Sequence, residues 1–349
     1  MEEDFDVYAI CDFTQNKHVK IQLTEMGVCP LDINLSKSTF SLIKDFIYFL
    51  NLLKIFSKYK PQAVFSYTLK PIVYGSIAAK IINIENICSM FSGLGYLFTD
   101  KKKGFRVKLG KLLVFLANCC ADRIIFHNKD DYQELLKQKI VSSDKKILIV
   151  NGSGVSLEEF KFSENIFLNN EINVLMISRF IKEKGVREYM EAAEKIISKY
   201  DNVTFNLAGY FEEGEDTLKK DDLKKYFAYP KIKNLGKIER VFQAIQRCNI
   251  YVLPSYREGT PRSVLEAMAT GRAVVTTDAP GCRNTVINNF NGFLVEPKNS
   301  VELSNALEKL INDKNLISNM GKNSRKLAED KFCDKRVADE MYRFVFKCF

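Results

Sequence analysis

The segment YREGTPRSVLEAMATGRAVV, residues 256–275, carries two glutamates eight positions apart, Glu258 in a loop and Glu266 in a predicted helix. Two carboxylates repel a phosphate that they touch, but they accept hydrogen bonds from hydroxyls on either side of one. A nucleotide sugar has this layout, with sugar hydroxyls, a diphosphate and ribose hydroxyls in sequence. The alternative is that both glutamates are solvated surface residues, which is the usual fate of glutamate.

The helix that carries Glu266 is predicted at 261–269, after the predicted strand 249–255. Thr260 suits its N-cap position and Pro261 its first turn, where the missing N–H costs nothing. The amides of this helix N-terminus then face the carboxyl ends of the strands, where open α/β sheets bind ligands. We therefore place Gly259, Thr260 and Pro261 with the two glutamates in a site that binds the nucleotide sugar, called the donor-binding site below.

A second cationic motif is SRFIKEKG, residues 178–185. Arg179 closes a predicted strand, and Lys184 precedes the next helix, so both charges lie at the carboxyl edge of the same sheet. There they could neutralise a diphosphate. A solvated strand end is the alternative, but with the first motif the pocket becomes balanced in charge. We assign Arg179, Lys184 and Glu258 to the catalytic set, and Arg179 and Lys184 also to donor binding.

A third feature is the segment KKKGFRVKLGKLLVFLANCC, residues 101–120, in which a basic start precedes a helical pattern. This combination is typical of a helix that dips into the interface of an anionic membrane, and the alternative is a core-packed helix after a basic loop. The apolar residues on one predicted face are Phe105, Leu109, Leu112, Leu113 and Leu116. The basic residues are Lys101, Lys102, Lys103, Arg106, Lys108 and Lys111.

The composition limits the classes of partner. Of the 349 residues 46% are hydrophobic, which is ordinary for a soluble globular protein. The net charge of +9 favours an anionic partner. No nucleic-acid-binding motif accompanies the charge, so we expect no nucleic acid partner. Nine scattered cysteines without a Cys-x-x-Cys pair predict small core residues in a reducing compartment. With two histidines and no clustered ligands, we expect no metal site.

Strand-like and helical runs alternate along the chain, which predicts parallel sheets covered on both faces. Two consecutive doubly wound units are the simplest arrangement, with 159–171 as the linker. We predict an N-terminal domain at 1–160, a C-terminal domain at 170–333, and a last helix, 334–349, that crosses back. The predicted strands are 7–11, 63–67, 85–91, 123–128, 146–151, 172–178, 203–209, 232–236, 249–255 and 273–278.

Neither a signal peptide nor a membrane span is predicted. The start, MEEDFDVYAI, is acidic where a signal peptide would be basic and then apolar. The run FSLIKDFIYFLNLLKIF, residues 40–56, comes nearest to a membrane span, but polar and charged residues interrupt it. We predict a buried helix there.

Three segments together resemble the retaining GT-B glycosyltransferases of family four. They are SRFIKEKGV, LPSYREGTPRSVLEAMATGRAVVTTDAPGCRNTVINNFNGFLV and FSGLGYLFT. The likeness is greatest to bacterial enzymes that extend undecaprenyl-diphosphate-linked sugars, among them N-acetylgalactosaminyltransferases of N-glycosylation. It implies two Rossmann-like domains facing a central cleft. It also implies a UDP-sugar donor, a lipid-diphosphate-linked saccharide acceptor, no metal or other cofactor, and a cytoplasmic protein held peripherally at the inner face of the membrane.

The resemblance also implies roles for individual residues. Glu266 binds the ribose, Glu258 contacts the donor hexose, and Arg179 and Lys184 hold the diphosphate. The loop after strand 85–91 reads Ser92-Gly93-Leu94-Gly95, where many relatives carry a histidine. On the acceptor and membrane side we place Ser92, Gly93, Gly95, Lys101, Lys102, Lys103, Phe105 and Arg106.

Relatives carry one more strand and an Asn-Phe-Arg-like loop before the match to FDVYAICDF, so we expect either that the start is misplaced or that the first domain lacks its first βα unit. Two other functions stay open. One is a UDP-sugar 2-epimerase of the same architecture, and the other is an inactive binding module.

Overall fold

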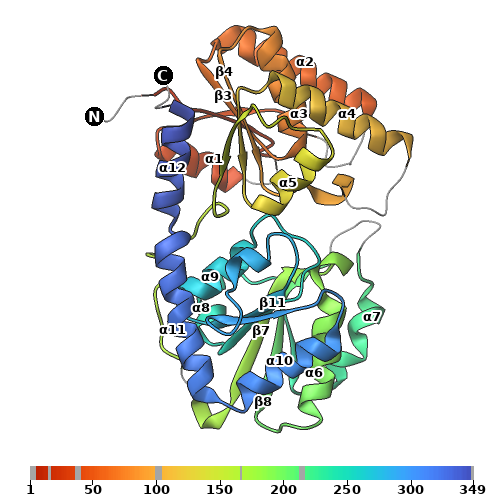
Figure 1. Ribbon diagram of the computed structural model, residues 1–349, viewed down its shortest axis with the longest axis vertical. Helices are drawn as coiled ribbons and strands as arrows, with labels where there is room; N and C mark the ends of the chain where they lie inside the picture. The colour runs from red at the N-terminus through yellow and green to blue at the C-terminus, as the bar shows by residue number, and fades with distance from the viewer. Residues whose placement is uncertain are drawn as a thin grey trace. The chain divides into compact units, whose positions relative to one another are not determined.

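The computed structural model describes residues 5–14, 17–35, 41–98, 104–165, 167–211 and 217–346 (Figure 1). The chain divides into two compact units. One contains residues 1–90 and 108–123, and the other contains 91–107 and 124–349. The boundaries at 160 and 170 stay a prediction.

The first unit begins with β1 (Tyr8–Cys11) and β2 (Cys29–Asp32), which pair in parallel as a two-stranded sheet. The strands β3 (Ala63–Tyr67) and β4 (Asn86–Phe91) also pair in parallel. The helices are α1 (Lys17–Glu25), α2 (Leu42–Tyr59), α3 (Leu69–Ile81) and α4 (Phe105–Cys120). The sequence pattern did not predict β2, which is short and contains a proline, or α1, which buries none of its residues.

Helix α2 corrects one prediction, because it is buried on one side only. Tyr48, Leu52 and Phe56 are almost fully buried. Ile43 and Phe46 on the other side are 76% and 60% exposed. The buried helix expected at 40–56 is therefore wrong for this side. The described part of the chain contains no helix long and apolar enough to cross a bilayer.

The second unit contains the remaining elements, and its core is a six-stranded parallel sheet in the order β12-β11-β10-β7-β8-β9. Figure 1 shows α8, α9 and α11 on one face of this sheet and α6, α7 and α10 on the other. The strands are β5 (Arg123–Phe126), β6 (Lys146–Ile149), β7 (Ile172–Arg179), β8 (Val203–Tyr210), β9 (Ile232–Gly236), β10 (Ile250–Leu253), β11 (Ala273–Thr277) and β12 (Gly292–Val295). The helices are α5 (Lys129–Lys137), α6 (Val186–Ile197), α7 (Lys220–Lys224), α8 (Val241–Gln246), α9 (Arg262–Thr270), α10 (Ser300–Ile311), α11 (Lys314–Lys331) and α12 (Asp334–Phe346).

The strand order reverses between β7 and β10, which are neighbours in this sheet. From β7 the chain winds outward through β8 and β9, then returns to β10 and winds the other way. The loops after the two neighbouring strands diverge at such a point and leave room for a ligand beyond their carboxyl ends. Both motifs chosen from the sequence lie where these two strands end: 178–185 begins with the last two residues of β7, and 256–275 begins three residues after β10.

The predicted linker 159–171 is fastened to this unit by a buried arginine. The guanidinium of Arg272 donates to the carbonyl of Ser163 over 2.7 Å and to that of Cys248 over 3.0 Å. It also donates to the side-chain oxygen of Asn165 over 2.9 Å. Arg272 is fully buried, and burial lowers its pKa from the ordinary arginine value. The linker segment is thus bound to the second unit, just before β11, by side-chain hydrogen bonds.

The cysteines are only partly where the sequence placed them. Cys88, Cys248 and Cys282 are buried, as expected of small core residues, whereas Cys11 and Cys119 are exposed. The expectation of core positions is therefore wrong for these two and for Cys29. Cys11 and Cys29 occupy exposed end positions of two four-residue strands, and Cys119 lies on the exposed side of α4.

Candidate functional site

The loop after β10 and the turn after β7 meet through an ion pair between Lys184 and Glu258. The same carboxylate oxygen of Glu258 accepts a hydrogen bond from the hydroxyl of Ser255 over 2.7 Å. Both charged side chains are mostly buried, with 17% of Lys184 and 14% of Glu258 exposed. The structure thus brings together two of the three residues chosen for the catalytic set.

The backbone holds the two loops together at the same place. The carbonyl of Glu183 accepts from the amide of Tyr256 over 2.8 Å and from the hydroxyl of Ser255 over 3.1 Å. Gly185 has a φ of 70°, and a Cβ there would lie 2.1 Å from the carbonyl oxygen of Pro254. A larger residue would push the loops apart, so the glycine after Lys184 is required by the close approach.

Arg179, the third residue of the catalytic set, is the last residue of β7 and is exposed. It lies at the carboxyl edge of the sheet, five residues before Lys184. The position agrees with the prediction, and the role of Arg179 stays a prediction.

The start of α9 differs from the prediction. The helix begins at Arg262, with Pro261 at the N-cap position (φ −72°, ψ 109°) and no side-chain cap. The hydroxyl of Thr260 instead donates to the carbonyl of His127 over 3.0 Å. Thr260 is therefore not the N-cap, because the helix begins one residue later than predicted and Pro261 takes that position.

Glu266 is the fifth residue of α9 and is only 8% exposed. One of its carboxylate oxygens accepts from Nε of Arg262 over 3.0 Å. Burial raises the pKa of Glu266 to about 7, although the neighbouring Arg262 lowers it and Glu159 adds a smaller raising effect. The two glutamates thus have separate partners.

The loop predicted for the acceptor packs directly on Gly259. A Cβ on Gly259 would lie 1.7 Å from the carbonyl oxygen of Ser92, and one on Gly93 would lie 3.2 Å from the amide nitrogen of Gly259. Gly152, in the glycine-rich loop after β6, lies against Thr260 in the same way. The residues chosen for the donor therefore adjoin two glycine-rich loops. Gly95 is exposed at the start of a short 3₁₀ helix.

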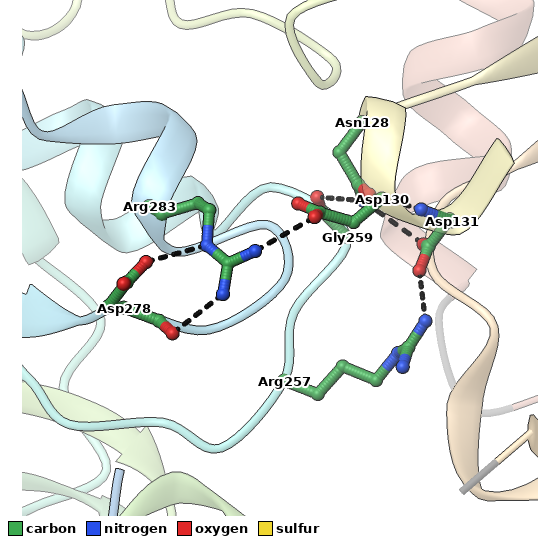
Figure 2. Close-up of polar contacts among 7 residues, drawn as sticks. All are labelled: Asn128, Asp130, Asp131, Arg257, Gly259, Asp278 and Arg283. Carbon is green, nitrogen blue, oxygen red and sulfur yellow. Dashed lines mark hydrogen bonds and ion pairs between the residues drawn. The ribbon is translucent and has the colours of Figure 1, made fainter. Parts of the chain in front are cut away.

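Sequence reasoning missed a polar network at the start of α5, shown in Figure 2. Asp131, which is fully buried, forms an ion pair with Arg257. The side-chain amide of Asn128 donates to the carbonyl of Gly259 over 2.6 Å and to Asp131 over 3.0 Å. Burial raises the pKa of Asp131, and the guanidinium of Arg257 opposes this shift. Both residues on either side of Glu258 are therefore held from the β5–α5 junction.

A second, more exposed pair lies beside this network (Figure 2). Arg283 donates to the carboxylate of Asp130 over 2.9 Å and to that of Asp278 over 2.7 Å. The only sequence signal for either pair was Asn128, a good N-cap residue before two aspartates. Its side chain does accept from the amide of Asp131 over 2.8 Å.

The residues chosen for membrane contact are described only in part. Lys101, Lys102 and Lys103 lie outside the described residues, and so does the side chain of Arg106. Phe105 is 80% exposed at the start of α4, and Leu112 and Leu116 are also exposed. The alternative, in which Phe105, Leu109 and Leu112 pack against the core, is contradicted for Phe105 and Leu112, whereas Leu109 is half-buried.

The described residues include no group of three or more His, Cys, Asp or Glu side chains arranged to hold a metal ion. Burial lowers the pKa of His127 to about 4, so its ring is neutral at pH 7.

Two family models match the chain. Residues 158–327 match the model described as "Glycosyl transferases group 1", and residues 1–128 match "Glycosyl transferase 4-like". Together they account for the segments that carry the site and for most of the first unit.

Curated relatives match over most of the chain. A Campylobacter jejuni protein named N,N'-diacetylbacillosaminyl-diphospho-undecaprenol alpha-1,3-N-acetylgalactosaminyltransferase is 28% identical over 87% of this chain and 82% of its own. The Staphylococcus aureus capsular polysaccharide biosynthesis glycosyltransferase CapM is 29% identical over the same shares. The Escherichia coli UDP-Gal:alpha-D-GlcNAc-diphosphoundecaprenol alpha-1,3-galactosyltransferase is 28% identical over 82% of this chain and 75% of its own.

Solved structures share the fold at lower identity. Anabaena HepE, in complex with UDP and glucose, has a TM-score of 0.75 at 19% identity, covering 93% of this chain and 88% of its own. Sucrose-phosphate synthase from Thermosynechococcus elongatus has a TM-score of 0.76 at 17% identity, covering 99% of this chain and all of its own. The two family models, the relatives aligned over most of its length and the shared fold show that the chain belongs to the group 1, family-4-like glycosyltransferases of GT-B fold.

Proposed function

We propose that this glycosyltransferase moves a hexose or N-acetylhexosamine from a UDP-sugar to an undecaprenyl-diphosphate-linked saccharide, with retention of the anomeric configuration. N-acetylgalactosamine is the favoured sugar, because a relative aligned over 87% of the chain is named for its transfer. The observation that carries the proposal is the Lys184–Glu258 pair at the switch point of the doubly wound sheet. It puts a cation and a hydroxyl acceptor where such folds bind a nucleotide.

The chemistry requires one bond to break and one to form at the anomeric carbon. The bond to the diphosphate oxygen of UDP breaks, and a bond to the acceptor hydroxyl oxygen forms. The acceptor proton passes to a diphosphate oxygen as that group leaves. Lys184 and Arg179 stabilise the charge that develops on the diphosphate, so we propose that the reaction needs no metal ion.

The remaining donor residues have complementary roles. Glu266 accepts hydrogen bonds from the ribose hydroxyls, and Glu258 accepts from the donor hexose when Lys184 turns toward the diphosphate. Gly259 allows the backbone of this loop to approach the Ser92–Gly93 loop, which we assign to the acceptor side.

We also propose a peripheral position at the inner face of the cell membrane. The acceptors named for the relatives are attached to a lipid, so an enzyme that uses one has to reach the bilayer surface. The exposed Phe105, Leu112 and Leu116 on α4 support this proposal. Nucleic acid is not among the proposed partners.

The test is acceptor-dependent release of UDP. The protein is incubated with UDP-N-acetylgalactosamine, UDP-galactose or UDP-N-acetylglucosamine, with and without a short-chain lipid-diphosphate saccharide, and with and without a chelator. A transferase releases UDP only with acceptor and ignores the chelator. Interconversion of UDP-sugars without acceptor would identify an epimerase, and binding without any turnover would identify a binding module.

A further inference from the structure

The exposed side of α2 is apolar in its first half. Ile43, Phe46, Ile47 and Leu50 are 76%, 60%, 51% and 47% exposed. Their spacing of three, four and seven residues puts them on one side of the helix, one above the other. The described residues of the fold do not cover this stripe.

All exposed charges on the described part of α2 are positive. Lys44 lies beside the stripe, and Lys54 and Lys58 continue the exposed side in the second half. The single acidic residue of the helix, Asp45, points inward, with 5% of its side chain exposed, and pairs with Lys70 over 2.6 Å. The exposed side therefore presents apolar and cationic groups with no carboxylate among them.

The stripe is not needed to hold α2 in place. Its opposite side is buried through Tyr48, Leu52 and Phe56, and Tyr48 packs edge-on against Tyr74 of α3 with ring centroids 6.0 Å apart. Four large apolar side chains in water raise the free energy of the protein unless something covers them. A partner with an apolar interior beneath a negatively charged outer layer matches this combination of apolar and cationic side chains.

We infer that α2 lies along an anionic phospholipid bilayer. Ile43, Phe46, Ile47 and Leu50 enter the interface, and Lys44, Lys54 and Lys58 lie at the level of the phosphates. The helix is 18 residues long, or about 27 Å, which suits a helix that rests in the plane of the interface. The inference rests on the proposed function only in that a lipid-diphosphate acceptor presents its sugars at this surface, and it differs from the α4 proposal in residues and element.

The test is co-sedimentation of the full chain with vesicles of phosphatidylethanolamine and phosphatidylglycerol. Phe46→Gln with Leu50→Gln should lower partitioning at least about tenfold. Lys44→Gln with Lys54→Gln and Lys58→Gln should lower it on the order of a hundredfold at low salt and remove most of its salt dependence. A matched control, Lys233→Gln with Lys322→Gln and Lys326→Gln, has the same net charge as the second variant and should bind like the parent.

The outcomes separate this surface from the proposed function. If both α2 variants keep their thermal unfolding temperature yet bind vesicles like the parent, the inference is wrong, and so it is if the parent does not bind. If the control falls as far as the α2 lysine variant, only net charge matters and the inference is again wrong. Transfer to a short-chain acceptor in detergent-free solution should be unchanged in the α2 variants. Loss of vesicle binding in a protein that never turns over a UDP-sugar would support the surface and overturn the proposed function.

Discussion

Arg257 and Asp131 form an ion pair that joins the residue before Glu258 to the beginning of α5 (Figure 2). Asp131 is fully buried, whereas 22% of the Arg257 side chain is exposed. The carboxylate therefore depends on this one cation and on Asn128. The loop that carries Glu258 is therefore held in place by an ion pair whose carboxylate, that of Asp131, has no access to solvent.

Arg257→Gln should destabilise the protein by about 3 kcal/mol, because it leaves a buried carboxylate without its cation. Burial already raises the pKa of Asp131, and loss of Arg257 raises it further. A carboxyl with a folded pKa above its unfolded value disfavours folding once ionised, so stability is greatest at low pH and falls as pH rises through that range. Urea unfolding at mildly acidic and mildly alkaline pH should show the larger loss at alkaline pH.

The matched control for this variant is Arg283→Gln, which breaks a neighbouring pair that is 38% exposed on the arginine side. It should cost about 1 kcal/mol or less. Equal losses in the two variants would show that the burial of Asp131 has no energetic consequence.

Glu266→Gln should remove a pH dependence from donor binding. Ribose hydroxyls donate more strongly to an ionised carboxylate than to a protonated one. The affinity of the parent protein for UDP-N-acetylgalactosamine should therefore increase as the pH is raised through about 7, the pKa of Glu266. This probe has a diphosphate diester with no proton to titrate in that range. Calorimetry across the range would detect the slope in the parent and its absence in the variant.

Glu266→Ala should lower UDP affinity about tenfold or more, because a charge-assisted hydrogen bond contributes roughly 1.5–3 kcal/mol. Unchanged affinity in a folded variant would exclude Glu266 from the nucleotide site.

Lys184→Ala and Arg179→Ala should each reduce turnover more than they reduce stability. Their charges act most strongly when the departing diphosphate gains charge. Lys184→Ala also frees Glu258 from its ion pair, so this variant should in addition alter the KM for the donor. Variants that lose thermal stability but keep normal kcat would show that the two cations are structural.

Gly259→Ala should abolish turnover while the protein stays folded. A methyl group there would lie 1.7 Å from the carbonyl oxygen of Ser92, so the two loops have to separate. Circular dichroism and UDP release with acceptor would distinguish the two effects. A variant with parental activity would mean that the contact between the loops is not required.

Lys101→Gln with Lys102→Gln and Lys103→Gln should weaken binding to anionic vesicles and reduce its salt dependence. Each basic residue near the surface contributes about 1 kcal/mol, screened over about a Debye length. Co-sedimentation at two salt concentrations measures both effects, and binding equal to that of the parent would remove this segment from the membrane contact.

Part of the site could be predicted because it follows strand ends. Lys184 and Glu258 were chosen separately, and they meet because β7 and β10 are neighbours at the point where the sheet reverses. Their local sequences contain the strand, the turn and the helix start, which are properties of short segments.

The rest depends on tertiary packing. Nothing in the sequence relates Asp131 to Arg257, which are 126 residues apart without any period. Thr260 was expected to cap α9, but the helix begins one residue later, and the hydroxyl of Thr260 donates to the carbonyl of His127, which is 133 positions away in the sequence. The exposure of α2 was hidden because apolar residues occur on both of its sides, so periodicity does not distinguish the side in contact with the core.

The hydrogen bonds of Arg272 have a consequence for limited proteolysis. The segment 159–171 has the composition of a connector that a protease would cut first. Its backbone at Ser163 is bound to a guanidinium inside the protein, so cleavage after the exposed Lys161 requires that this part first detaches. A shortened gene product that begins after this segment would leave Arg272 facing an open surface without two of its three partners. Fragments intended to bind nucleotide should therefore begin before Phe160, which is itself part of the core of the second unit.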